Sequence, residues 1–172
     1  TAPKEAVGFL SRASECSLFN NCHASNMRCA NESEATTSSS LAAGFVLRAY
    51  DSVNERYATV NNSFARCMNG GAGAAVGIML NGTTEAGITD NHAITSHGDT
   101  AGAVGYGIQD LAVNSHAMIL KNTAYGNATA NYSINYTDNR SLPLYVGFYA
   151  EKNNIKLNNP WESSLANKEI VG

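Results

Sequence analysis

The chain has 172 residues, with 14 acidic and 11 basic side chains, a net charge of −3 and a charged fraction of 15%. This length suits one domain with a sizeable core, and the charged fraction is low against about 25% in ordinary globular proteins. We expect no nucleic-acid partner, because phosphate binding needs a concentrated basic face, and no membrane insertion, because the longest charge-free apolar stretch covers only residues 70–80.

A three-residue pattern recurs five times, roughly every thirty residues, as in proteins built from stacked repeats. It consists of an apolar residue, a small residue and a bulky apolar residue. Because residues two apart share one face of a strand, each copy predicts a strand with both apolar side chains on the same face. The copies are Val7-Gly8-Phe9, Ala43-Gly44-Phe45, Val76-Gly77-Ile78, Tyr106-Gly107-Ile108 and Tyr132-Ser133-Ile134.

A second pattern lies between these copies, with an apolar residue followed five positions later by alanine. In the first four copies Asn or Asp lies between the two, and both residue types tolerate the left-handed backbone that a corner between strands requires. Stacked at one corner, their amides can also hydrogen-bond from one repeat to the next. The pairs are Phe19/Ala24, Val60/Ala65, Ile88/Ala93, Ile119/Ala124 and, less regularly, Tyr145/Ala150, with corner asparagines at Asn21, Asn62, Asn91 and Asn122.

These small–apolar pairs and asparagine corners resemble those of the right-handed parallel β-helix proteins, the pectin-lyase-like repeat family. The resemblance covers roughly residues 5–155 and implies an all-β solenoid of about five rungs. On this basis residues 1–157 are the parallel β-helix repeats and residues 158–172 a C-terminal cap or exit segment. The family hosts unrelated functions, so the resemblance is informative mainly about the fold.

The stacked repeats predict one continuous interior column. Successive rungs would bring the side chains of Phe9, Phe45, Ile78, Ile108 and Ile134 above one another, away from water. The pattern begins by residue 7, with little sequence ahead of it to cover the first rung. Because an open end would expose strand edges, we expect missing upstream rungs, a missing cap or a partner there.

Catalytic motifs of pectin-degrading enzymes are incomplete here. The nearest pieces are residues 89–91 and 96–99, and general acid–base chemistry needs its groups within hydrogen-bond reach. The alternative is that these polar side chains are solvated loop residues, which we favour, so enzyme activity is uncertain. The catalytic candidates are Asp90, His92, Asp99 and Lys121, with His97 and His116 as further groups that could converge on them.

The four cysteines are Cys16, Cys22, Cys29 and Cys67, and their spacing does not choose among the three pairings that four cysteines allow. The first three and His23 lie within one rung, which raises a zinc interpretation. The gaps between them lack the close cysteine pair usual in structural zinc sites. We therefore favour structural thiols packed in the coil over disulfides or zinc, and we expect no metal and no cofactor.

Seven Asn-x-Ser/Thr sequons could carry glycans if the chain passes through a glycosylating compartment. The alternative, which we favour, is that these residues are corner asparagines of the repeats. The seven are Asn31, Asn61, Asn81, Asn127, Asn131, Asn135 and Asn139.

Two functions fit this sequence. The first is a structural or recognition module of a surface, appendage or virion protein, which presents loops to glycans or protein partners and is extracellular, on a cell surface or on a virion. Low charge and many neutral polar side chains favour it, and the resemblance implies a homotrimer or larger assembly. The second is a carbohydrate-active lyase or hydrolase that acts on an acidic polysaccharide.

Overall fold

The computed structural model describes residues 5–12, 16–29, 40–48, 57–82, 86–97, 104–111, 117–134 and 155–157. These residues form fourteen β-strands and contain no helix, so none that could cross a membrane is found among them. All of the strand pairs are parallel. The predicted all-β class, with short parallel strands, is therefore confirmed. The proposed cap, residues 158–172, and the Tyr145/Ala150 pair lie outside the described residues.

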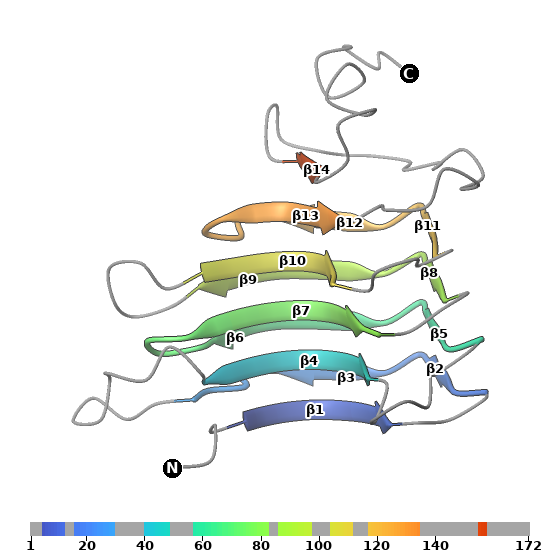
Figure 1. The fold of residues 1–172 in the computed structure, drawn as a ribbon, viewed down its shortest axis with the longest axis horizontal. Helices are drawn as coiled ribbons and strands as arrows, with labels where there is room; N and C mark the ends of the chain where they lie inside the picture. Colours follow the sequence, from blue (N-terminus) through green and yellow to red (C-terminus); the bar gives the residue numbers. More distant parts are fainter. Residues whose placement is uncertain are drawn as a thin grey trace.

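The strands are arranged in three sheets (Figure 1). The first sheet contains, in order, β1 (Glu5–Arg12), β4 (Leu41–Arg48), β7 (Ala74–Asn81), β10 (Val104–Asp110), β13 (Ala130–Ile134) and β14 (Ile155–Leu157). The second contains β2 (Leu18–Asn20), β5 (Thr59–Asn61), β8 (Gly87–Thr89) and β11 (Met118–Leu120). The third contains β3 (His23–Ser25), β6 (Phe64–Asn69), β9 (His92–His97) and β12 (Thr123–Tyr125).

From β1 to β13, consecutive strands belong to different sheets and strands three apart in chain order pair with each other, whereas β14 pairs directly with β13. We call each set of three consecutive strands a layer, so that β1–β3, β4–β6, β7–β9 and β10–β12 are layers one to four, and β13 begins the fifth. The layers lie above one another in Figure 1. Neighbouring strands in a sheet are about 4.8 Å apart, and this spacing sets the rise from one layer to the next.

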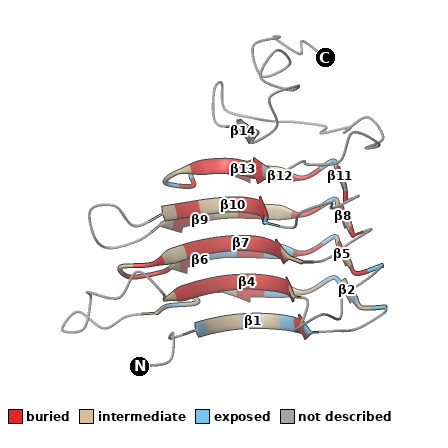
Figure 2. Cartoon of the chain, in the orientation of Figure 1, coloured by how far each residue is buried: buried red, intermediate tan, exposed pale blue. Residues whose placement is uncertain are grey.

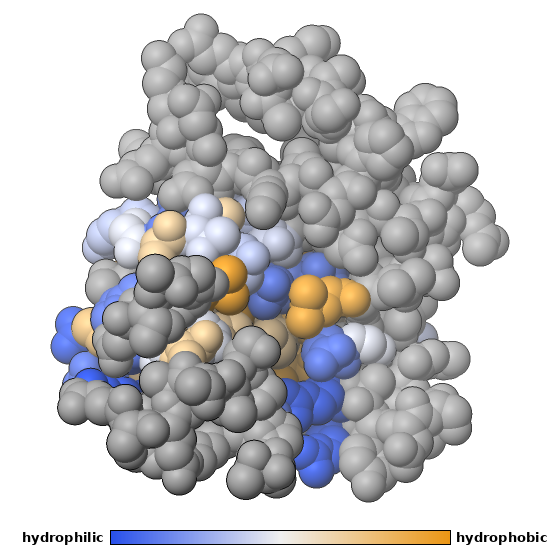
Figure 3. Space-filling model, turned by 60° about the vertical axis from the view of Figure 1, so that its left-hand side comes forward, coloured by the Kyte–Doolittle hydropathy of each residue, from blue (hydrophilic) through white to orange (hydrophobic). Residues whose placement is uncertain are grey.

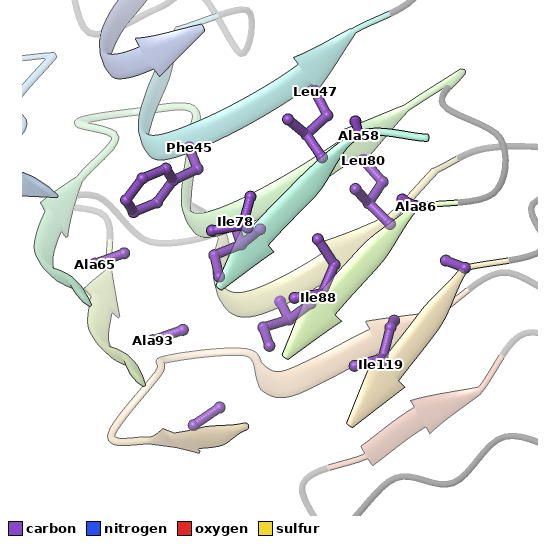
Figure 4. Packing of buried hydrophobic residues seen from close by; sticks show 14 of the residues in the cluster. Phe45, Leu47, Ala58, Ala65, Ile78, Leu80, Ala86, Ile88, Ala93 and Ile119 are labelled. Atoms are coloured by element: carbon purple, nitrogen blue, oxygen red, sulfur yellow. The ribbon is translucent and has the colours of Figure 1, made fainter. Parts of the chain in front are cut away.

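The interior column is confirmed for its first four members. Phe9 is in register with Phe45, Phe45 with Ile78, and Ile78 with Ile108. The rings of Phe9 and Phe45 stack with centroids 4.9 Å apart and planes inclined by 8°. Side chains from all three sheets meet around this column in one apolar core (Figure 4).

The fifth member of the column was predicted wrongly. Tyr132, and not Ile134, is in register with Ile108, and Ile134 is in register with Asp110. Because side-chain direction repeats every two residues, a shift of the strand register by two residues leaves the alternation of hydrophobic residues unchanged, so the sequence pattern does not reveal it. The place of glycine in this layer is taken by Asn131, whose side-chain oxygen accepts a hydrogen bond from Asn127 Nδ2 at 3.0 Å.

The expectation that the residues on either side of each glycine share a face is also wrong. Ile78 packs in the interior, whereas Val76 belongs to a second apolar cluster with Leu41, Val46 and Met79. A Cβ placed on Gly77 would meet Ala93 Cβ at 2.8 Å, so both the glycine and the residue after it face the interior. The pleat breaks at the glycine, and both faces of β4 and β7 are buried (Figure 2).

The corner asparagines form two adjacent columns, where one was expected. The register of Asn61 with Thr89, and of Thr89 with Leu120, places Asn91 and Asn122 one residue further along than Asn21 and Asn62. The exposed corner column has left-handed backbone, with φ between 46° and 55°; it consists of Asn21, Asn62, Asp90 and Lys121. The inner corner column consists of Cys22, Ser63, Asn91 and Asn122.

Hydrogen bonds link the inner corner column from layer to layer, as predicted for stacked amides. Asn122 Oδ1 accepts from the backbone nitrogen and from Nδ2 of Asn91, both at 3.0 Å, while Asn122 Nδ2 donates to Ile88 O at 2.7 Å. Asn91 repeats this one layer earlier, accepting from Ser63 N at 2.9 Å and donating to Val60 O at 2.8 Å. Each of these side chains therefore satisfies backbone groups of the preceding layer.

Tyr132 gives a testable pH dependence. Its hydroxyl donates to Asn122 O at 2.7 Å, and burial raises the pKa of Tyr132 above its ordinary value of 10.0. Below pH 10 the hydroxyl is protonated in both states, whereas above it the unfolded chain ionises first, so stability falls as the pH rises. Tyr132→Phe should cost about 1 kcal/mol at neutral pH and should reduce this alkaline decline, as measured by urea unfolding at a series of pH values. Tyr125→Phe, at an exposed position, is the control; an equal alkaline decline in Tyr132→Phe would contradict the prediction.

Candidate recognition face on the third sheet

The outward side of the third sheet carries the largest gathering of exposed rings in the described part of the chain. The interior side of this sheet is a column of alanines, Ala24, Ala65, Ala93 and Ala124, in register with one another. Since side chains alternate across a strand, the residues on either side of each alanine point away from the core. We call this surface the outer face of the third sheet; its residues are His23, Ser25, Phe64, Arg66, His92, Ile94, Thr123 and Tyr125.

The centre of this face is an aromatic stack. Phe64 is in register with His23 on one side and with His92 on the other. The rings of Phe64 and His92 are stacked, with centroids 4.5 Å apart and planes inclined by 3°, while His23 is tilted against Phe64 at 5.9 Å. Phe64 remains 41% exposed, and Tyr125, two layers further on, is 45% exposed. Because the two faces of the Phe64 ring meet His92 and His23, the exposed apolar surface of the stack consists of its ring edges.

Polar side chains border the stack on one side. Each residue of the exposed corner column lies two positions before a residue of the outer-face column that contains the stack, as Asn62 does before Phe64 and Asp90 before His92. This column consists of His23, Phe64, His92 and Thr123. Asp90 and Lys121 occupy equivalent corner positions in adjacent layers, and both are exposed. This border supplies hydrogen-bond acceptors and donors next to the rings.

Three of the catalytic candidates thus lie near one another at this corner: Asp90, His92 and Lys121. Asp99 and His116 lie outside the described residues. His97 ends β9, in register with Asn69, at the opposite end of the strand from His92. Asp90 is the one carboxylate among the described residues of this face and its corner, so a second carboxylate for acid–base chemistry is not found in that part of the chain.

The side of the molecule where the third sheet leads into the first is mixed in character. Figure 3, in which the left side of Figure 1 comes forward, shows strongly hydrophilic residues directly beside hydrophobic ones. Arg66 is exposed on the outer face of the third sheet, in register with Ser25 and Ile94. Such a surface combines apolar contact area with charge-assisted hydrogen bonding.

The cysteines do not converge on a metal site. Cys22 packs against the core, whereas His23, the next residue, points outward and contacts Phe64. No group of three or more metal-ligating side chains occurs within the ranges that the structure describes. Cys16, Cys22, Cys29 and Cys67 all lie in those ranges and form no disulfide with one another.

The sequons differ in what surrounds their asparagines. Asn127 and Asn131 are buried and hydrogen-bonded to each other, so a glycan on either would have to displace packed structure. Asn61 and Asn81 are half-exposed, and Asn61 Oδ1 accepts from Thr89 Oγ1 at 3.2 Å. Asn31, Asn135 and Asn139 lie outside the described residues.

Comparisons of the chain with protein-family models, with curated proteins and with solved structures find no match. The function is therefore inferred from the geometry of the outer face.

Sequence reasoning missed Phe64, Arg66 and Tyr125 as surface residues of interest. A usable signal was present, because each lies directly next to an alanine of the repeat, and alternation then places it on the outward side. It was not used because the residue types in these columns vary from layer to layer.

Proposed function

We propose that this chain is a structural and recognition module, built as a right-handed parallel β-helix, whose outer face on the third sheet binds glycans. The observation that carries the proposal is the parallel stack of Phe64 and His92, whose ring edges are exposed beside the polar corner. Sugars combine apolar ring faces with hydroxyl groups, so they suit an exposed apolar surface bordered by hydrogen-bonding side chains. The parallel layers supply a rigid base that holds these side chains in place.

The pectin-lyase-like resemblance and its setting, on a cell surface, appendage or virion, belong to the same proposal. The register of the interior column through four layers supports it, as does the hydrogen-bonded inner corner column. Presentation of loops to a protein partner and assembly into a homotrimer stay predictions from the sequence.

The test is binding to a printed panel of neutral and acidic oligosaccharides, followed by titration calorimetry with any that bind. We expect Phe64→Ala to weaken binding by roughly tenfold, equivalent to about 1.4 kcal/mol, because the exposed part of the aromatic ring is lost as an apolar contact for the ligand. Leu18→Ala is the matched control, since Leu18 is 68% exposed but lies on the second sheet. Unchanged affinity in Phe64→Ala, or equal loss in both variants, would show that the ligand does not use this face.

A carbohydrate-active enzyme is the second candidate, favoured by the gathering of Asp90, His92 and Lys121 at one corner. Its test is turnover of an acidic polysaccharide panel with and without Ca²⁺. Saturable turnover that Asp90→Ala abolishes would establish this function in place of simple recognition. We rank it below recognition because the described part of this corner offers a single carboxylate.

A further inference from the structure

With 21 asparagines, the chain is exposed to deamidation, a reaction that needs only water. The backbone nitrogen of the following residue attacks Cγ of asparagine and forms a new N–Cγ bond. The Cγ–Nδ2 bond breaks, and the amide proton leaves with the amino group as ammonia. Water then opens the cyclic imide at either carbonyl, giving aspartate or isoaspartate. The step is easiest where the next residue is glycine and its amide is not held by a hydrogen bond.

Hydrogen bonds between layers hold most of the backbone N–H groups that follow the described asparagines. Among the described asparagines, the residue that follows usually donates its backbone N–H to an adjacent layer, so the nitrogen cannot turn back on Cγ unless that bond opens. The amides held in this way, each with its acceptor, are Asn21 to Asn61 O, Cys22 to Ser63 Oγ, Asn62 to Thr89 O, Ser63 to Asn91 Oδ1, Gly70 to His97 O, His92 to Ser63 O, Thr123 to Asn91 O and Ala128 to Ser96 O.

Asn69–Gly70 shows how strong this protection is, because it has the most reactive dipeptide sequence. Gly70 is buried, and its nitrogen donates to His97 O at 3.1 Å. The side chain is held as well, since Asn69 Oδ1 accepts from Gly71 N at 2.9 Å. Both reacting groups are therefore engaged elsewhere.

Asn81–Gly82 has the same dipeptide sequence without that protection. Asn81 is the last residue of β7, and Gly82 has a left-handed φ of 79°. Neither Gly82 N nor the Asn81 side chain forms a hydrogen bond to any residue that the structure describes. The remaining cases, Asn26 and Asn131, precede Met27 and Tyr132, whose side chains hinder attack.

We propose that, among the described asparagines, Asn81 is the one at which the folded protein deamidates fastest, and that the interlayer hydrogen bonds protect the eight whose following N–H groups they hold. The surroundings accept the negative charge that results. Asn81 is in register with Arg48, whose guanidinium pairs with Glu5 through Nη1 at 2.9 Å but has a buried Nε without a hydrogen-bond partner, so a carboxylate at position 81 would lie beside a cation with a donor still to offer. This inference is independent of what the outer face of the third sheet binds.

The test is incubation of the full chain at mildly alkaline pH, with peptide mapping by mass spectrometry at intervals. In the folded protein, aspartate and isoaspartate should accumulate at position 81 at least about tenfold faster than at position 69, because position 69 reacts only after local opening. In denaturant the two Asn–Gly sites should react at similar rates. Equal rates at the two sites in the folded protein would overturn the proposal, as would an Asn81 that reacts only in denaturant.

Two variants give a second readout that does not depend on peptide recovery. Asn81→Gln should stop the growth of the more acidic species seen by ion exchange, because cyclisation of glutamine is much slower. Asn69→Gln should leave that growth unchanged. If the acidic species grows as fast in Asn81→Gln as in the parent, the modified site lies elsewhere and the assignment fails.

Discussion

Replacing Asn122 by alanine is expected to lower the free energy of unfolding by about 3 kcal/mol. The substitution removes three buried hydrogen bonds, two accepted from Asn91 and one donated to Ile88 O. It leaves the backbone N–H of Asn91 without its acceptor and removes a donor from Ile88 O, and a buried group without a partner costs about 1–3 kcal/mol. Urea unfolding followed by circular dichroism measures the loss.

Asn20→Ala is the matched control, because Asn20 is exposed on β2 and its side chain has no bond to the preceding or following layer among the described residues. Its stability should stay within about 0.5 kcal/mol of the parent. Asn122→Asp adds a diagnostic, since it keeps an acceptor for Asn91 but loses the donor to Ile88 O and buries a charge. Parent-like stability in Asn122→Ala would show that the amide does not join the layers.

Gly77→Ala is expected to have an effect of similar size, about 3 kcal/mol, for a steric reason. The new Cβ would lie 2.6 Å from Gly107 O and 2.8 Å from Ala93 Cβ. Gly107 belongs to β10, the neighbouring strand of the same sheet, and Ala93 to β9 of the third sheet, so the clash is relieved only if β10 moves and the first sheet shifts away from the third. Chemical and thermal unfolding of the variant measure the cost.

Gly87→Ala separates this steric effect from the general effect of adding a methyl group to a strand glycine. The nearest atom to a Cβ there is Thr59 Oγ1 at 3.5 Å, an ordinary contact. We expect unchanged or slightly higher stability, because alanine restricts the unfolded chain more than glycine does. A Gly77→Ala protein as stable as Gly87→Ala would mean that the sheets do not approach each other as described.

Much of the fold could be predicted because the repeated side chains keep their type from layer to layer. The column of Phe9, Phe45, Ile78 and Ile108 and the alanine column of the third sheet both follow from spacing alone. The breaks in regularity could not be predicted. A glycine permits the pleat to break, as at Gly77, but nothing in the sequence shows that it does.

The corner asparagines were assigned to a single column for a related reason. Asn occupies the exposed corner position in the first two layers, at Asn21 and Asn62, but the inner position one residue later in the next two, at Asn91 and Asn122, so aligning Asn with Asn shifted the pattern by one residue. Only the pairing of Asn61 with Thr89 resolves which residue is exposed. The candidate face was missed because its defining property, exposed aromatic surface shared by several layers, depends on register and not on any single motif.

The interlayer amides have a consequence for how such a chain can change in length. In the inner corner column, each amide satisfies backbone groups of the layer before it, as Asn91 does for Val60 and Asn122 for Ile88. A tandem duplication of one complete layer would therefore supply the side-chain amide that satisfies the backbone groups of the layer before it, and the existing layers would need no compensating substitution. Each added layer would lengthen the molecule by about 4.8 Å along the stacking axis, so the number of layers sets its length.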